Sequence, residues 1–258
     1  MPGKIQQLID AWNAERFAPG ARNILAGDAG VLDGKDEERH LKSWHELITS
    51  NDFGEEDGCD FHFGLLPMPY LGNLRRARVF LCSLNPGVGP HDYFGEHHVD
   101  EYREALLKNL RQDDDTRFPF LEPKHSWHGG SAYWAPRIRG IARAVQQQLQ
   151  VKSREALDVC SRNIAVLELV PYHSGVFKLD RREIDGLEST RLMRDFVFGE
   201  LLPRHRSGDC KLIVLRSREK WLRPSDDAPD FPNPTLYRNA YIAETDARSA
   251  AAIICRFT

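Results

Sequence analysis

Three short apolar segments that alternate with helical patterns are the feature that most constrains the fold. These candidate strands, rich in aliphatic and β-branched residues, cover residues 77–83, 164–170 and 211–215. Candidate helices lie between and after them, over residues 99–111, 133–149, 190–202 and 217–222. Alternation of this kind predicts an α/β fold with a central, mostly parallel sheet flanked by helices.

The N-terminal region has a helical pattern of its own. Ile5, Leu8, Ile9 and Trp12 share one helix face, and a second candidate helix covers residues 37–49. We therefore divide the chain into an N-terminal helical extension, 1–57, and an α/β domain, 58–258.

Composition places the protein in the reducing cytoplasm. No run of about 18 apolar residues occurs, and the first residues lack the layout of a signal peptide, so no membrane association is expected. The five cysteines are scattered without a C-x-x-C pair, which argues against a disulfide framework and a zinc site. The expected location is cytoplasmic.

The net charge of −3 limits how the chain could bind nucleic acid. A protein that coats DNA is usually strongly basic, so any DNA contact must come from a local patch. Basic residues cluster at 75–78, 204–206 and 216–223. Each cluster alone is also compatible with a solvated surface.

The carboxyl ends of the three candidate strands carry the polar residues best suited to chemistry. In open parallel sheets, ligands bind beyond these ends. Asn85-Pro86-Gly87 follows the first strand, and Arg216 follows the third. The second ends in Glu168 and continues into a loop that contains His173 and Ser174. One site at this edge is the prediction.

Asn85-Pro86-Gly87 has two interpretations. Pro86 fixes its own φ and Gly87 permits a close backbone approach, so the segment could be only a tight turn. Alternatively, Asn85 presents its amide to a water or a ligand, with backbone N–H groups beside it. Asp92 stands where a G-x-G-x-x-G motif needs its third glycine, which argues against a dinucleotide site.

The segment Ser83-Leu-Asn-Pro-Gly resembles the first catalytic motif of the mismatch-specific and single-strand-selective branches of the uracil-DNA glycosylase superfamily. The resemblance implies that Asn85 holds the hydrolytic water and that Pro86 and Gly87 adjoin the base. It also implies that an aromatic side chain downstream, Tyr93 or Phe94, stacks on the flipped base.

A second motif near the C-terminus supports the same likeness. Phe231-Pro-Asn-Pro-Thr resembles the Asn-Pro-Ser motif of the mismatch-specific branch, with Thr in place of Ser. The likeness implies that Asn233 faces the base and that residues 235–238, including Thr235 and Arg238, enter the DNA stack. It spans residues 65 to 240, and the pattern is also similar to uncharacterised bacterial glycosylase-like proteins.

Glu168 stands where the superfamily has its base-reading Asn. An ionised carboxylate would accept from the amino group of a modified cytosine. A carboxyl protonated by burial would instead donate to a carbonyl oxygen, as in uracil. Alternatively, Glu168 pairs with an Arg inside the fold. His173 is a candidate general acid or donor to the departing base, and Ser174 and Arg216 are candidate phosphate contacts.

These residues together predict a monofunctional DNA glycosylase that cleaves the N-glycosidic bond of a flipped pyrimidine, either uracil or a modified cytosine. No lysine in the motifs suits Schiff-base chemistry, and no cofactor is required. The expected partner is DNA, with no obligate protein partner. Repair and defence against phage DNA both fit. The alternatives are a catalytically silent nucleic-acid or nucleotide-binding protein of this fold, and a metal-dependent hydrolase using His125 and His128, for which no metal-site spacing is present.

Overall fold

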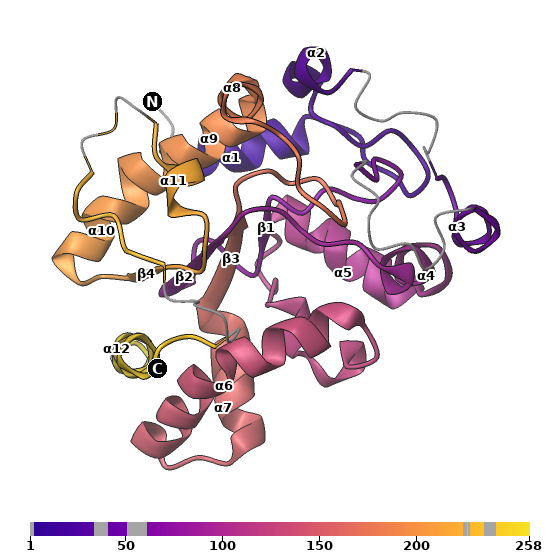
Figure 1. Ribbon diagram of the computed structural model, residues 1–258. Coiled ribbons are helices and arrows are strands. Elements are labelled where there is room, and N and C mark those ends of the chain that lie inside the picture. Colours follow the sequence, from indigo (N-terminus) through magenta and orange to yellow (C-terminus); the bar gives the residue numbers. More distant parts are fainter. Residues whose placement is uncertain (1–2, 34–40, 51–60, 224–225, 227, 235–240) are drawn as a thin grey trace.

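A four-stranded mixed sheet, flanked by helices, organises the α/β fold (Figure 1). The computed structural model describes residues 3–33, 41–50, 61–223, 226, 228–234 and 241–258. Its strands are β1 (Tyr70–Leu71), β2 (Val79–Ser83), β3 (Ile164–Glu168) and β4 (Lys211–Val214), in the order β1-β3-β2-β4. Strand β2 pairs in parallel with β3 and β4, whereas β1 pairs antiparallel with β3. The three predicted strands are confirmed.

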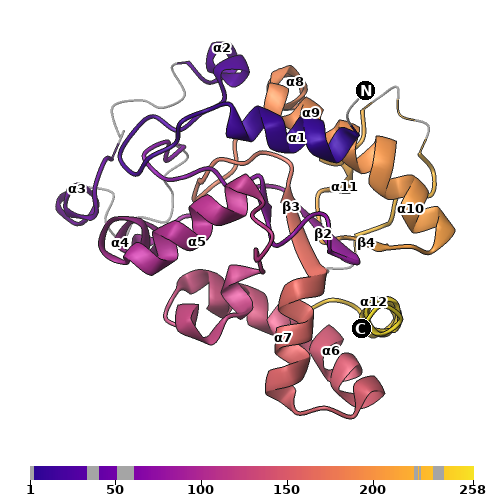
Figure 2. The same ribbon diagram turned by 180° about the vertical axis from the view of Figure 1, so that it is seen from behind.

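Successive side chains of a strand point to opposite faces of the sheet, so alternate residues pack into two separate hydrophobic cores. Phe80 and Leu167 belong to one core, which also includes residues of α1 (Lys4–Asn13) and α9 (Glu188–Phe196). Leu81 belongs to the other. Figure 2 shows α6 and α7 on one side of the sheet and α1 and α9 on the opposite side. The helices of the second core are α5 (Asp100–Arg111), α6 (Gly129–Leu149), α7 (Ser153–Asn163) and α12 (Glu244–Cys255).

The remaining elements are short. They are α2 (Ala29–Leu32), α3 (Trp44–Thr49), α4 (Pro90–His98), α8 (Arg181–Gly186), α10 (Leu202–Ser207), α11 (Arg218–Trp221), the π-helical η4 (Val197–Leu201), and the 3-10 turns η1 (Ala26–Asp28), η2 (Pro119–Leu121) and η3 (Pro123–His125). The single helix predicted over 190–202 is instead α9, the π-turn η4 and the start of α10. Residues 37–40 of the predicted second helix lie outside the described residues.

The N-terminal region is joined to the sheet through a buried polar contact as well as through the α1 core. The Tyr172 hydroxyl donates to Asp28 Oδ2 at 2.6 Å, and the Ser189 amide donates to Asp28 Oδ1 at 3.0 Å. The Leu25 amide in turn donates to the Tyr172 hydroxyl at 3.1 Å. These bonds fix the start of the loop that follows β3.

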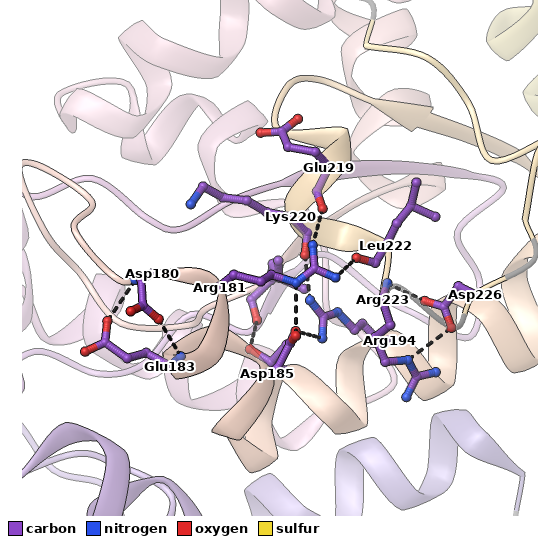
Figure 3. Close-up of polar contacts among 12 residues, drawn as sticks. Asp180, Arg181, Glu183, Asp185, Arg194, Glu219, Lys220, Leu222, Arg223 and Asp226 are labelled. Atoms are coloured by element: carbon purple, nitrogen blue, oxygen red, sulfur yellow. Dashed lines mark hydrogen bonds and ion pairs between the residues drawn. The ribbon is translucent and has the colours of Figure 1, made fainter.

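A second network fixes the segment that follows β4 (Figure 3). The buried Arg194 of α9 pairs with Asp185 at 2.6 Å and donates to the Lys220 carbonyl at 2.6 Å. Arg181 donates to the carbonyls of Glu219 and Leu222. Two guanidinium groups thus satisfy carbonyls in and just after the short helix α11.

None of the helices in the described part of the chain is long and apolar enough to cross a membrane. Cys82, Cys160 and Cys210 are fully buried among apolar side chains and carry no disulfide, so they serve as packing residues.

Replacing Arg194 with Met should destabilise the protein by about 2–4 kcal/mol, because a buried cation and two hydrogen bonds are lost and Asp185 keeps only Arg181. Urea unfolding measures the change. Arg191→Met is the matched control: it removes an exposed arginine paired with Glu188, and should cost less than about 0.5 kcal/mol. Equal losses in both variants would contradict a structural role for the buried pair.

Candidate functional site

A cavity of about 330 Å³ opens at the carboxyl ends of β2, β3 and β4. Seven of the residues predicted for the base and DNA site line it: Asn85, Pro86, Gly87, Glu168, His173, Ser174 and Arg216. The first turn of α6 closes the opposite side. The volume falls within the range of about 300–1,000 Å³ found for small-molecule sites.

Backbone pairing that continues beyond the strands brings these residues together. The Val170 amide donates to the Leu84 carbonyl at 2.9 Å, and the Ser174 amide donates to the Pro86 carbonyl at 3.2 Å. The loops after β2 and β3 therefore stay side by side for several residues. Asn85 and His173 meet because neither loop turns away at the strand end.

Asn85 is oriented by two hydrogen bonds from its amide nitrogen. Nδ2 donates to the Pro86 carbonyl and to Ser174 Oγ, each at 2.9 Å. A carbonyl oxygen can only accept, so its position identifies the nitrogen of the Asn85 side chain. Within the described residues no donor contacts Asn85 Oδ1, which is left to accept a hydrogen bond from a molecule in the cavity.

His173 has a defined tautomer when its ring is neutral. Its Nδ1 lies 2.6 Å from the Gly87 carbonyl oxygen, so Nδ1 carries the proton. The other nitrogen, Nε2, is buried and has no partner among the described residues. Nε2 of the neutral ring is consequently a hydrogen-bond acceptor that borders the cavity.

Glu168 is 3% exposed and lies at the end of β3, opposite Ser83 in the parallel register. Its Oε2 is buried without a hydrogen-bond partner in the part of the chain that the structure describes. Burial raises the pKa of Glu168 from 4.5 to about 8, although a hydrogen bond from Ser83 and the charge of Arg216 lower it in part. The carboxyl group is therefore mostly protonated at neutral pH.

His128, which was not expected at a base site, has the tautomer opposite to that of His173. The Gly130 amide donates to His128 Nδ1 at 3.0 Å, so the proton of the neutral ring is on Nε2. Burial lowers the pKa of His128 to about 4, which keeps the ring neutral. Nε2 lies 3.4 Å from Asp92 Oδ1 at the cavity wall.

Aromatic side chains from outside the predicted motifs form the rest of the wall. Phe120, Tyr133 and Trp134 line the cavity, and Phe120 stacks on His128 with ring centroids 5.0 Å apart. A Cβ on Gly130 would lie 2.5 Å from the Phe120 ring, so only glycine fits there. The pair Gly129-Gly130 after His128 is the sequence signal that could have indicated this wall.

Neither Tyr93 nor Phe94 is part of the cavity lining, so the structure does not bring either expected base-stacking residue to this site. Tyr93 faces a small apolar cluster with Leu41 and Leu65, and its hydroxyl contacts His62 Nδ1 at 3.1 Å. Phe94, 41% exposed, packs against Trp127 outside the cavity. The faces of α4 are set by packing, and its cavity-facing residues are His91 and Asp92.

The second sequence motif is also displaced from the cavity. Phe231 is buried and its ring lies 5.0 Å from that of Phe198, and this anchor leaves Asn233 exposed and away from the cavity lining. The catalytic role expected for Asn233 is thus not supported. Thr235 and Arg238 lie outside the described residues.

The histidines considered for metal binding are held by other contacts. His125 Nδ1 lies 3.0 Å from the Pro119 carbonyl oxygen, and His128 stacks on both Tyr102 and Phe120. Over residues 3–33, 41–50, 61–223, 226, 228–234 and 241–258, no group of three or more His, Cys, Asp or Glu side chains could hold a metal ion.

Comparisons with protein-family models, with curated proteins and with solved structures gave no match.

Replacing Glu168 with Gln should raise the free energy of unfolding relative to the wild type, by an amount that grows as pH rises. The folded pKa of about 8 exceeds the unfolded value near 4.5, so the native state retains a proton that the unfolded state loses. The stability that this proton confers on the wild type is complete below the unfolded pKa and is lost as pH rises through about 8. A shift of this size corresponds to about 5 kcal/mol at most.

Urea unfolding from about pH 5 to about pH 9 measures the difference between wild type and Glu168→Gln. Glu219→Gln, an exposed carboxyl on α11, is the control and should show no such trend. A difference that stays constant with pH would mean that Glu168 is ionised throughout.

Proposed function

We propose that the protein is a monofunctional DNA glycosylase that excises a pyrimidine with a carbonyl oxygen at C4, with uracil as the simplest substrate, and that its fold is of the uracil-DNA glycosylase type. The observation that carries the proposal is the buried, unpartnered Oε2 of Glu168 in a cavity that also contains Asn85 and His173. A buried polar atom without a partner costs free energy, so its presence at a cavity points to a ligand group that satisfies it.

The protonation state of Glu168 decides which base fits. A neutral carboxyl group offers one O–H donor and one acceptor oxygen, which match the C4 carbonyl and the N3–H of uracil. An ionised carboxylate offers acceptors only and would favour the amino group of cytosine. Since the pKa of Glu168 is about 8, the neutral form dominates near pH 7 and favours the carbonyl. Base-excision repair of deaminated cytosine suits this preference better than defence against modified cytosine.

Asn85 and His173 supply two acceptors for the attacking water. Asn85 Oδ1 would accept one water hydrogen, and His173 Nε2 would accept the other and take up the proton as the water oxygen bonds to C1′ of the sugar. This assignment makes neutral His173 a base toward water. The general-acid role expected for His173 would instead require a doubly protonated ring.

The departing base takes the electron pair of the broken C1′–N1 bond, and donors near its oxygen stabilise the resulting charge. His128 Nε2–H is such a donor, because its ring is neutral and its position is fixed by the Gly130 amide. The aromatic rings of Phe120 and Tyr133 provide flat surfaces for the base. No lysine lines the cavity within the described residues, in keeping with hydrolysis without a Schiff base.

Asn85→Ala should lower excision by about 100-fold or more, because the water loses an acceptor that orients it. Purified protein is incubated with labelled oligonucleotides containing uracil, mismatched thymine, hypoxanthine or hydroxymethylcytosine, and alkali then reveals abasic sites. Asn13→Ala, at an exposed position, is the control. If none of these substrates gives abasic sites while DNA binding is retained, the result would favour a catalytically silent binding protein of the same fold.

The pH dependence of excision should follow the protonation of Glu168. The active form is protonated, so kcat/KM for uracil should fall as pH rises through about 8. Glu168→Gln keeps a donor at every pH and should remove this alkaline limb. An alkaline limb that persists unchanged in Glu168→Gln would assign it to another group.

A further inference from the structure

Two arginines, one in the cavity lining and one against a ring of the cavity wall, form no ion pair with a carboxylate in the part of the chain that the structure describes. Arg216 lines the cavity at the end of β4 and is exposed. Arg137 of α6 lies with its guanidinium 3.3 Å from the centroid of the Tyr133 ring, and Tyr133 is part of the cavity wall.

Arg137 and Arg216 are related through the cavity wall, because the Tyr133 ring under the Arg137 guanidinium lines the same cavity as Arg216. The charge of Arg216 lowers the pKa of Arg137, after the larger effect of burial. Arg137 Nε is buried and has no hydrogen-bond partner among the described residues, although its Nη1 donates to the Tyr133 carbonyl. Two like charges and an unsatisfied donor at one edge are unfavourable unless an anion lies between them.

The backbone around Arg216 is fixed, which makes it suited to hold a ligand. Ser217 has a left-handed conformation with φ of 58°, and Arg218 Nε donates to the Phe231 carbonyl at 3.1 Å. The network of Arg181 and Arg194 holds the next residues, as Figure 3 shows. The main chain is thus anchored on the far side of Arg216, while its side chain remains exposed.

We propose that Arg137 and Arg216 together bind one phosphodiester group of the DNA strand, next to the nucleotide whose base enters the cavity. Arginine suits this role because its planar group donates two parallel hydrogen bonds to phosphate oxygens. The inference rests on the proposed function for its ligand. It adds Arg137, which lies outside every sequence motif, and it assigns Tyr133 a second role as the ring that supports the Arg137 guanidinium.

The test is the salt dependence of DNA binding, measured by fluorescence anisotropy with a labelled single-stranded oligonucleotide. Loss of one phosphate contact on single-stranded DNA lowers the slope of log K against log salt concentration by about 0.7, whatever the base sequence. Arg137→Gln and Arg216→Gln should each lower the slope by up to about 0.7, because each removes one of the two cations on the same phosphate. Arg139→Gln, an exposed arginine on the same helix that neither lines the cavity nor lies on the Tyr133 ring, should leave the slope unchanged.

Thermal melting of each variant identifies any loss of folding, and Arg137→Lys provides a second variant that keeps the charge and should retain most of the slope. Unchanged slopes in both Gln variants would overturn phosphate binding by Arg137 and Arg216, even if the protein excises uracil. Reduced slopes without abasic sites on any substrate would support phosphate binding by this pair and refute the glycosylase, so the two proposals fail separately. A slope that falls equally in Arg139→Gln would reduce the effect to net charge and overturn the proposed role of the pair.

Discussion

The parallel pairing of β2 with β3 is the constraint on which the site depends. The register places Ser83 opposite Glu168, so both strands end at the same level. The backbone bonds that follow, from Val170 to Leu84 and from Ser174 to Pro86, carry this pairing into the loops. A register shift of one residue would turn every side chain to the opposite face and take Glu168 out of the cavity.

The site combines groups whose hydrogen-bonding roles are fixed by their surroundings. The Pro86 carbonyl orients Asn85, the Gly87 carbonyl sets the tautomer of His173, and the Gly130 amide sets that of His128. The protonation of Glu168 depends on burial instead, and no described residue forms a hydrogen bond with its Oε2. The cavity therefore presents both hydrogen-bond acceptors and neutral donors, an arrangement suited to a polar ring and a water molecule.

The sequence predicted the parts of this arrangement that depend on local pattern. The three central strands were found from their apolar runs, and Asn85, Glu168 and Arg216 follow from the rule that ligands bind beyond strand ends. Strand β1 was missed because its two residues, between Pro69 and Gly72, are too few to show the alternating pattern of a strand.

The opposite wall could not be predicted in the same way. His128 and Tyr133 reach the cavity only through the packing of α6 against the sheet, which no local pattern records. Tyr93 was a wrong choice for the same reason: its position near the motif is local, whereas the face of α4 that meets the cavity is decided by tertiary contacts. Motif likeness led to Asn85, which lines the cavity, and to Asn233, which is exposed next to the buried Phe231 and lies outside the lining.

The most direct measurement is a crystal structure of the Asn85→Ala protein with a single-stranded oligonucleotide that contains one deoxyuridine. We expect the uracil ring to occupy the cavity, with its C4 oxygen within hydrogen-bond distance of Glu168 Oε2 and its face against the aromatic wall. An oligonucleotide bound elsewhere, with this cavity free of the base, would contradict it.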